Sequence, residues 1–366
     1  MTRNINRRSF VKEAGIFSST ILIAPSCKLG NSQGVVNEKL GVALVGLGSY
    51  SRGNLAPALQ LTEHCELRGI VTGSPEKIPQ WQSQYGIKDE NVYNYENMHE
   101  LADNDDIDVV YIVVPTGLHK KYALIAANAG KHVWCEKPMA MNVRECQEII
   151  DACRSNQVKL CIGYRMQHEE NTKRVIDYAT SKPFGEIQSV KSEAGYRGGG
   201  GSGWRYQKAL GGGAMYDMGV YTVNGIRYST GMMPKRVIEA RHIINRPDLF
   251  KEVDETTEYS LELENGIIAK GRTSVGESMN ELRLDCERGW YNLSPMQSYS
   301  GVKGGTSNGE IWPASPKNQQ ATQMDDDALA IKNGSELMVP GEQGLIDIRI
   351  IEAIFESAAT GKSVDI

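Results

Sequence analysis

The segment LGVALVGLGSYSRG, Leu40–Gly53, decides the fold of this chain. Its apolar first half, up to Val45, is the kind of run that a strand buried on both faces needs. Gly46-Leu47-Gly48 then predicts a sharp turn, and the apolar spacing beyond it predicts a helix that continues to Leu61. A strand that enters a helix through such a turn points the free backbone N–H groups of the helix at an anion, typically a pyrophosphate.

The glycine pattern resembles the fingerprint G-x-G-x-x-G/A of dinucleotide-binding proteins. Gly46 permits the turn and Gly48 lets a ligand approach the backbone, while Ser51 stands at the third position, where the fingerprint has glycine or alanine. We therefore predict that a dinucleotide contacts Gly46, Gly48, Ser49 and Tyr50. An ordinary tight turn between strand and helix is the alternative.

A second predicted strand, Cys65–Val71, ends at Thr72-Gly73-Ser74-Pro75. Enzymes that prefer NAD place a carboxylate at this strand end to bind the ribose 2′-hydroxyl. The small residues Thr72, Gly73 and Ser74, with Lys77 nearby, suit a 2′-phosphate instead. The pattern favours NADP, with NAD as the alternative. Ser74 is placed as an N-cap and Pro75 as the first helical residue, so a plain capped helix beside a solvated lysine also fits.

The next stretches alternate between strands and helices. Strands are predicted at 93–95, 109–114, 132–135 and 158–162, and helices at 97–102, 122–129 and 143–155. Such alternation predicts a doubly wound parallel sheet, in which ligands bind beyond the carboxyl ends of the strands. The residues expected at those ends are Pro115, Thr116, His119, Glu136 and Lys137. His119 is a cofactor contact or a structural residue of the loop.

The first 35 residues are predicted to be an export signal and a polar linker. Arg7-Arg8-Ser9-Phe10-Val11-Lys12 matches the twin-arginine pattern, and the apolar run Ala14–Ala24 is too short for a membrane-spanning helix. We expect export to the periplasm, with Cys27 as a candidate for lipidation. A basic terminus on a cytoplasmic protein is the alternative.

Composition and charge argue against several classes of function. The 366-residue chain has a formal net charge of −5 and no basic stripe, which argues against nucleic-acid binding. Its seven cysteines form no CxxC pair and no metal-ligand spacing with the six histidines, so we predict buried thiols, no bound metal and no disulfide framework.

The predicted organisation is α/β with two domains. Residues 36–163 form the Rossmann domain with the parallel sheet. Residues 164–366 form a sugar-binding α+β domain with a large, mostly antiparallel open sheet. Its strands are predicted at 187–196, 236–244, 257–263, 267–275, 282–285 and 290–293, and the polar stretch 297–323 as an irregular excursion. The C-terminal helix, 341–360, is expected to pack back toward the first domain, and we expect a homo-oligomer formed through the open face of the sheet.

Several motifs together resemble the Gfo/Idh/MocA superfamily of dehydrogenases. In order they are Gly46-Leu47-Gly48, Val114–His119, Gly130–Pro138 with its Glu136-Lys137-Pro138 tripeptide, Leu160–Arg165, Gly211–Tyr221 and Pro340–Gly344. The resemblance covers the chain from residue 40 onward. The twin-arginine pattern, Thr72-Gly73-Ser74 and Tyr221 are most similar to the glucose–fructose oxidoreductase type.

This resemblance implies a catalytic group of Lys137, Asp217 and Tyr221. Asp217 and Tyr221 are four residues apart and share one face of a helix. Many relatives have histidine at the place of Tyr221. A free tyrosine, with a pKa near 10, is a poor base at neutral pH, and an ammonium beside it favours the phenolate. Gly211-Gly212-Gly213 would let the backbone approach a flat ring. Further contacts to sugar or cofactor are expected from Arg165, Trp204 and Arg205.

The implied function is an NADP-dependent oxidoreductase that moves a hydride between C1 of a pyranose, or a related polyol, and tightly held nicotinamide. A second sugar such as a ketose would return the hydride. Two alternatives remain open. Some relatives are glycosidases that use NAD for transient oxidation and elimination, and others could bind sugars without catalysis. Assays of net sugar oxidation and of aglycone release from aryl glycosides together separate the three.

Overall fold

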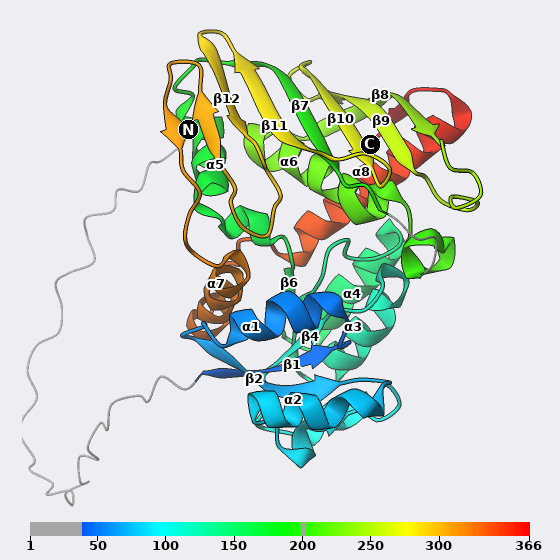
Figure 1. Cartoon of the computed structure of the whole chain (residues 1–366), viewed down its shortest axis with the longest axis vertical. Coiled ribbons are helices and arrows are strands. Elements are labelled where there is room, and N and C mark those ends of the chain that lie inside the picture. Colours follow the sequence, from blue (N-terminus) through cyan, green and yellow to red (C-terminus); the bar gives the residue numbers. More distant parts are fainter. Residues whose placement is uncertain (1–38, 199–202) are drawn as a thin grey trace, which may run out of the picture. The chain divides into compact units, whose positions relative to one another are not determined.

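The apolar run after Lys39 forms β1 (Leu40–Val45), a central strand of a parallel sheet in the computed structural model (Figure 1). The structure describes residues 39–198 and 203–366. In β1, Val45 lies opposite Val71 of β2 on one side and Ile112 of β4 on the other. The three strands therefore end at one edge, where the glycine turn begins.

The parallel sheet has the order β3-β2-β1-β4-β5-β6, which is the strand order of the dinucleotide-binding doubly wound fold. The remaining strands are β2 (Cys65–Val71), β3 (Val92–Tyr93), β4 (Val109–Ile112), β5 (His132–Cys135) and β6 (Leu160–Ile162). The predicted parallel sheet is confirmed, and β2 and β5 have the predicted bounds.

Helices cover both faces of this sheet. They are η1 (Ser51–Leu55), α1 (Ala56–Leu59), η2 (Pro75–Lys77), α2 (Ile78–Tyr85), η3 (Asp89–Asn91), η4 (Met98–Asp103), η5 (Thr116–Leu118), α3 (His119–Asn128) and α4 (Val143–Ser155). One face packs on η1, α1 and α2, and the other on α3 and α4. The first of these helices was predicted too long, since α1 ends at Leu59 and Leu61 is exposed.

The second sheet has nine strands in the order β14-β13-β12-β11-β7-β10-β9-β8-β15. β7 and β10 are its parallel pair and the other neighbours are antiparallel, so the predicted mostly antiparallel sheet is confirmed. Its strands are β7 (Ile187–Gly195), β8 (Pro234–Ile243), β9 (Thr256–Leu263), β10 (Ile268–Ser274), β11 (Met279–Cys286), β12 (Gly289–Leu293), β13 (Gly304–Thr306), β14 (Ile311–Trp312) and β15 (Val364–Asp365).

Helices lie against one face of the second sheet (Figure 1). This part of the chain contains η6 (Arg165–His168), α5 (Glu170–Ser181), η7 (Trp204–Tyr206), η8 (Lys208–Leu210), η9 (Met215–Gly219), α6 (Val220–Thr230), α7 (Gln319–Asn333) and α8 (Gly341–Thr360). Every residue of α6 is buried. The opposite face carries exposed charged residues, including Lys191, Lys270 and Arg241.

The C-terminal part of the chain returns to the first sheet. Ala321, Met324 and Ala328 of α7 belong to the same buried cluster as Leu44 and Trp134. In α8, the backbone at Gly344 approaches Met139 and Ile162, which belong to the first part of the chain. The boundary predicted near residue 164 therefore separates two sheets, but α7 and α8 from beyond it also pack on the first part of the chain.

The prediction of an irregular excursion at 297–323 is wrong in part. This stretch contains β13, β14 and the first turn of α7. Trp312 of β14 is fully buried, while its neighbour Ile311 is 81% exposed. Short strands in a polar stretch carry too few apolar residues to show the alternation that predicts a strand.

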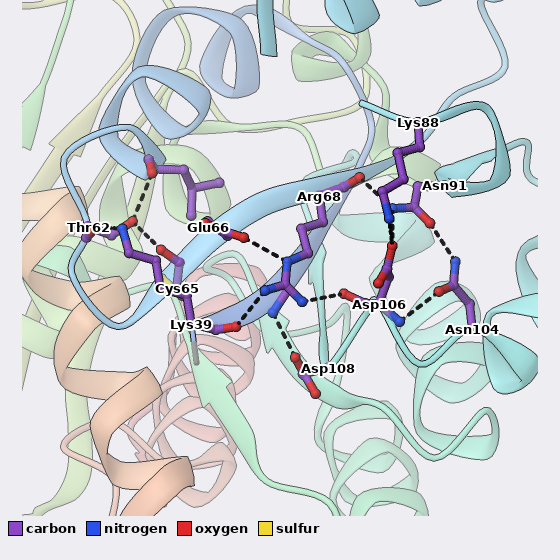
Figure 2. A network of polar contacts seen from close by, with 12 residues as sticks. Lys39, Thr62, Cys65, Glu66, Arg68, Lys88, Asn91, Asn104, Asp106 and Asp108 are labelled. Atoms are coloured by element: carbon purple, nitrogen blue, oxygen red, sulfur yellow. Dashed lines mark hydrogen bonds and ion pairs between the residues drawn. The ribbon is translucent and has the colours of Figure 1, made fainter. Parts of the chain in front are cut away.

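A polar network fixes the edge of the parallel sheet opposite the glycine turn (Figure 2). Arg68 on β2 donates to the carboxylate of Glu66 at 2.8 Å and to the carbonyl oxygens of Lys39 and Asp106 at 3.0 and 3.2 Å. A Cβ at Gly41 would lie 1.9 Å from the Asp106 carbonyl oxygen, so only glycine fits there. This edge is closed by the protein itself, and the carboxyl edge is left for a ligand.

Two further findings concern the described residues. No helix in residues 39–198 and 203–366 is long and apolar enough to cross a membrane. The six cysteines in these ranges are buried free thiols, as predicted for them. The predicted twin-arginine signal, the linker and Cys27 lie outside the described residues.

Candidate active site

The turn after β1 has the features that a dinucleotide phosphate needs. Gly46 has a φ of +95°, a conformation that favours glycine. A Cβ at Gly48 would meet no atom within 4 Å, and Ser49 beside it is exposed, so the backbone is open to a ligand here. The hydroxyl of Ser51 donates to the carbonyl of Gly46 at 2.6 Å. Ser51 therefore stabilises the turn from within, which explains why serine fits at the third fingerprint position.

The end of β2 carries no carboxylate. Thr72 is buried, and its hydroxyl accepts a hydrogen bond from the backbone N–H of Ser74. Ser74 is the N-cap residue of η2 and Pro75 is its first residue, as predicted, although the side chain of Ser74 makes no capping hydrogen bond. Lys77 reaches back to the glycine turn and donates to the carbonyl of Leu47 at 3.3 Å.

The loop after β4 packs against the loop that precedes η9. Thr116 is buried, and its Cβ lies 2.6 Å from where a Cβ on Gly211 would be. A Cβ on Gly117 would lie 2.3 Å from the carbonyl oxygen of Ala209. Pro115 precedes η5 as its N-cap residue. This close packing places the carboxyl ends of β4 and β5 beside η9 and α6.

His119 and Glu136 are buried in the protein. The ring nitrogens of His119 lie 2.9 Å from the carbonyl oxygen of Pro138 and 2.8 Å from that of Val114, and burial lowers the pKa of His119. Glu136 accepts a hydrogen bond from the hydroxyl of Tyr111 at 2.8 Å, and burial raises the pKa of Glu136. Both side chains support the strand ends and neither lines the cavity described next.

A cavity of about 630 Å³ lies beside the strand end that carries Lys137. Besides Lys137, it is lined by residues of four segments from the second part of the chain. These are Tyr196, Gly198, Gly203, Trp204, Arg205, Tyr206, Asp217, Met218, Tyr221, Gln297, Ser298 and Tyr299. The lining is rich in aromatic rings and has both charges, which suits a small polar ligand with apolar faces.

Lys137 and Tyr221 are in direct contact in this cavity. The ammonium nitrogen of Lys137 lies 4.2 Å from the centre of the Tyr221 ring and donates to the backbone carbonyl of Asp217 at 2.9 Å. This carbonyl belongs to the turn of helix that precedes Tyr221, so one cation contacts both predicted partners. The three predicted catalytic residues are adjacent in the structure.

The carboxylate of Asp217 is held on one side. Its Oδ2 accepts from the hydroxyl of Tyr196 at 2.7 Å and from Nε of Arg205 at 2.9 Å. Burial, with the nearby Asp217 charge, raises the pKa of Tyr196, so its hydroxyl keeps the proton that it donates. The guanidinium of Arg205 stacks over the ring of Trp204 at 4.6 Å. Both oxygens of a carboxylate accept hydrogen bonds, and within residues 39–198 and 203–366 the bonds to this carboxylate are made to Oδ2, which leaves Oδ1 for a ligand hydroxyl.

Arg165 lies behind the cavity and does not line it. It is 1% exposed, and its guanidinium carbon is 5.6 Å from the ring centre of Tyr221 and 4.6 Å from that of Tyr299. One of its terminal nitrogens donates to the carbonyl of Gln297 at 2.6 Å. The guanidinium of Arg165 therefore contacts the rings of Tyr221 and Tyr299, and its hydrogen bond to Gln297 holds the loop that carries Tyr299.

Tyr299 connects this loop to the glycine turn. Its ring stacks on that of Tyr50, with the ring centres 5.5 Å apart. Tyr299 is itself 52% exposed and lines the cavity. The pair joins the two parts of the chain at the edge where the predicted dinucleotide site and the cavity meet.

The sequence did not indicate Tyr196, Tyr206 or Tyr299 as site residues. Tyr196 was assigned to the end of a strand, and Tyr299 to the polar excursion. An aromatic residue that directly follows a strand, or stands alone in a polar stretch, is a signal that could have marked them. The sequence predicts that Gly211-Gly212-Gly213 lets the backbone approach a flat ring. In the structure, glycine is needed at these positions because a Cβ at each of them would strike protein atoms.

No group of three or more His, Cys, Asp or Glu side chains arranged for a metal ion occurs in residues 39–198 and 203–366. The carboxyl edge of the parallel sheet instead has the glycine turn, the exposed first helical turn and a cavity with a tyrosine–lysine pair. Together, the fold and this site define the class of dinucleotide-dependent oxidoreductases.

Comparisons with known proteins agree with this class. Residues 40–164 match the family model of the oxidoreductase family with an NAD-binding Rossmann fold, and residues 172–292 match the GFO/IDH/MocA C-terminal domain. The chain belongs to the GFO/IDH/MocA family of oxidoreductases.

Three relatives show the range of similarity. The crystal structure of aldose-aldose oxidoreductase from Caulobacter crescentus superposes with a TM-score of 0.86 and 35% identity, over 90% of this chain and 100% of that one. D-xylose 1-dehydrogenase [NADP(+)] of Haloarcula marismortui is 25% identical over 347 residues, 88% of this chain and 92% of that one. Apo scyllo-inositol dehydrogenase from Lactobacillus casei, 19% identical with a TM-score of 0.74 over 90% and 98% of the two chains, shares the fold.

Proposed function

We propose that this protein is an NADP-dependent sugar oxidoreductase that moves a hydride between C1 of a pyranose and a nicotinamide held through the whole cycle. The observation that carries the proposal is the contact of Lys137 with both the Tyr221 ring and the Asp217 carbonyl at the wall of a sugar-sized polar cavity. Two of the relatives described above are an aldose-aldose oxidoreductase and a D-xylose dehydrogenase, which supports a sugar as substrate.

The residues around the glycine turn fit a dinucleotide. Gly46, Gly48 and the backbone of Ser49 would hold the pyrophosphate, because the turn is open and the helix N-terminus carries partial positive charge. The absence of a carboxylate at Thr72-Gly73-Ser74, and the ammonium of Lys77 beside the turn, support NADP over NAD. The D-xylose 1-dehydrogenase relative is named for NADP(+), in agreement.

When bound, the nicotinamide supplies the hydride acceptor. The protein supplies the proton chemistry: the Tyr221 oxygen takes the proton of the C1 hydroxyl as the C1 hydride leaves, and the sugar becomes a lactone. The ammonium of Lys137 and the guanidinium of Arg165 lie on the Tyr221 ring, so their positive charge acts on the phenolate that accepts this proton and becomes a neutral phenol. Asp217, held by Tyr196 and Arg205, accepts a hydrogen bond from a sugar hydroxyl and orients the ring.

A second sugar returns the enzyme to its starting state in this proposal. It takes the hydride, and Tyr221 gives its proton back to the carbonyl oxygen, so no proton or electron is left over. An aldose is the acceptor that the aldose-aldose relative suggests, and a ketose is the other candidate. Such a cycle gives ping-pong kinetics.

A closed cycle also suits export. The twin-arginine pattern at Arg7-Arg8 predicts transport of the folded protein with its nucleotide already bound. Outside the cytoplasm, little free NADP is present to replace a lost molecule. We therefore propose a periplasmic location, with Cys27 as a candidate for lipidation.

The experiment that tests the function is to denature the purified protein and identify the released nucleotide, and to incubate the native protein with a panel of aldoses. NADP(H), released in about one equivalent and reduced by an aldose, supports the proposal. Release of aglycone from aryl glycosides without net oxidation would show a glycosidase, and absence of nucleotide would contradict the proposal.

A further inference from the structure

The helical segment with Asp217 and Tyr221 begins at a crowded turn. A Cβ on Gly213 would lie 2.2 Å from Oδ1 of Asp254, and Gly213 has a φ of +102°. Glycine is therefore required here, and the group that requires it is the carboxylate of Asp254.

Asp254 binds the start of this segment twice. Its Oδ2 accepts from the backbone N–H of Met215 at 2.9 Å, and its backbone carbonyl accepts from the N–H of Ala214 at 3.0 Å. Met215 is the first residue of η9, which carries Asp217 and continues into α6 with Tyr221. The first free N–H groups of a helix need such acceptors, and a negative charge is favourable at this end.

The carboxylate is in turn held by the second sheet. The hydroxyl of Thr257 on β9 donates to Oδ2 of Asp254 at 2.6 Å, and Nδ1 of His242 on β8 lies 2.8 Å from that hydroxyl. Asp254 is 6% exposed and does not line the cavity. A carboxylate this deeply buried is costly unless its hydrogen bonds compensate, and its side-chain bonds connect β9 to the start of η9.

We propose that Asp254 is a positioning residue for the reaction: it fixes the start of η9, and thereby the places of Asp217 and Tyr221 relative to Lys137. Lys137 holds the same turn from the other side through the Asp217 carbonyl. The segment is thus fixed at two points, one from each sheet. A shift of about 1 Å in reacting groups costs on the order of 100-fold in rate.

The kinetic test of this inference rests on the proposed function. The experiment therefore includes a second measurement that is independent of the proposed function. In the first arm, the rate of bound-nucleotide reduction is followed by absorbance after mixing with saturating aldose. In the second, hydrogen exchange of the peptide covering residues 213–221 is measured without any sugar. Both use the full protein with its nucleotide.

Asp254→Ala should lower the saturated reduction rate by about 10- to 100-fold, raise the sugar KM less, and speed exchange of the 213–221 peptide. Asp254→Asn keeps an oxygen acceptor for Met215 and should stay within about 5-fold of the wild-type rate. Nucleotide retention should be unchanged in both, because the expected dinucleotide contacts lie on the first sheet.

Glu255 provides the matched control. It is the adjacent residue, 2% exposed, and its carboxylate binds Arg246 and the backbone N–H of Asn245, not the η9 turn. Glu255→Ala should lower thermal stability but leave the rate and the 213–221 exchange close to wild type. Where Asp254→Ala does not fold, Thr257→Val removes one bond to the carboxylate and should give a smaller change of the same kind.

The two proposals fail separately. Wild-type exchange of the 213–221 peptide in Asp254→Ala and Thr257→Val, or equal rate losses in Glu255→Ala and Asp254→Ala, overturns the positioning role. No reduction of the wild-type nucleotide by any aldose overturns the proposed function, while faster exchange in Asp254→Ala still supports the positioning of η9.

Discussion

The Tyr221 ring lies against two cations, Lys137 at 4.2 Å and Arg165 at 5.6 Å from its centre. Such a contact contributes about 0.5–1 kcal/mol at an exposed site and about 2 kcal/mol when water is excluded. Both cations thus hold the Tyr221 ring at the wall of the cavity, where the proposed reaction needs its oxygen.

Tyr221→Phe removes the proton carrier and keeps the ring that both cations contact. The rate of bound-nucleotide reduction should therefore fall by about 100-fold or more, while nucleotide stays bound. Stopped-flow absorbance measures the rate, and nucleotide content after gel filtration measures retention. Tyr206→Phe, which changes another cavity tyrosine, is the control. A near-normal rate in Tyr221→Phe would transfer the role of base to another residue.

Tyr196→Phe removes the hydroxyl that holds Oδ2 of Asp217 at 2.7 Å. Because Arg205 still holds this oxygen, Asp217 keeps its place less firmly, and we expect the sugar KM to rise by about 5- to 10-fold, the effect of about 1 kcal/mol. The saturated rate should change less. Initial rates over a range of sugar concentrations give both values. An unchanged KM would show that Asp217 does not depend on Tyr196.

At the scale of residues, site residues that stand in sequence motifs could be predicted. Site residues that only the tertiary structure brings to the cavity could not. Lys137, Asp217 and Tyr221 stand in recognisable motifs, and the structure brings them together. Arg165 stands in one too, but its position behind the Tyr221 ring depends on how η6 packs. Tyr196 is 21 residues from Asp217 along the chain, so no local pattern connects them.

At the scale of elements, α7 shows how a late helix completes the first sheet. It packs Ala321, Met324 and Ala328 into that core, and it also buries Asp327 at 1% exposure. Burial raises the pKa of Asp327 to about 6, although the nearby His168 opposes this. The neighbouring Asp326 accepts from His168 at 2.8 Å and from Lys173 at 3.2 Å.

Asp327→Asn should stabilise the protein at neutral pH. The unfolded carboxyl has a pKa near 3.9, so between about pH 4 and pH 6 the native state binds more protons than the unfolded state. Stability from this group is therefore present at low pH and falls as pH rises through 6. We expect a gain of about 1–3 kcal/mol at pH 7.5 that falls to about a third of this value at pH 4.5 and disappears below about pH 3.5, measured by denaturant unfolding.

Asp326→Asn is the control with the opposite sign. The hydrogen bonds and charges of His168 and Lys173 outweigh burial and lower the pKa of Asp326. This variant should lose stability at pH 7.5, and the loss should disappear below about pH 4. Equal effects of Asp327→Asn at pH 4.5 and 7.5 would contradict the assignment of a strained buried carboxylate.

Most strands could be predicted because the apolar residues in their sequences are the residues that the sheets bury. β2, β5 and α4 have the predicted bounds. β13, β14 and α7 could not be predicted in detail, since their order comes from packing: β14 has two residues, and the first turn of α7 is polar and buried through Gln319 and Gln320. Propensity is a weak signal when tertiary contacts supply the stability.

At the scale of the whole molecule, the uncovered face of the second sheet bears paired charges. Arg241 and Arg272 both bind Glu258, at 2.6 and 2.9 Å, and Lys191 binds Glu193 at 2.7 Å. A hollow of about 990 Å³ lies over these strands. The homo-oligomer through this face stays a prediction, and a contact made by such charges would weaken with salt.

The proposed export is the second subject at this scale. Replacing Arg7 and Arg8 by lysine should leave the precursor in the cytoplasm, because the paired arginines are the feature that the twin-arginine route recognises. Immunoblots of periplasmic and cytoplasmic fractions measure the outcome, with Arg3→Lys, which lies outside the pattern, as control. Unchanged export of the double variant would contradict the predicted route.

The most direct test of the account follows the bound nucleotide through one cycle. Protein freed of loose nucleotide receives one aldose, and absorbance at the reduced nicotinamide band is recorded. A closed cycle predicts about one equivalent of reduction that then stops, and reoxidation with turnover when a second aldose or a ketose is added. Steady turnover with free NADP⁺ and no second sugar would contradict the closed cycle and would show a dehydrogenase that exchanges its nucleotide.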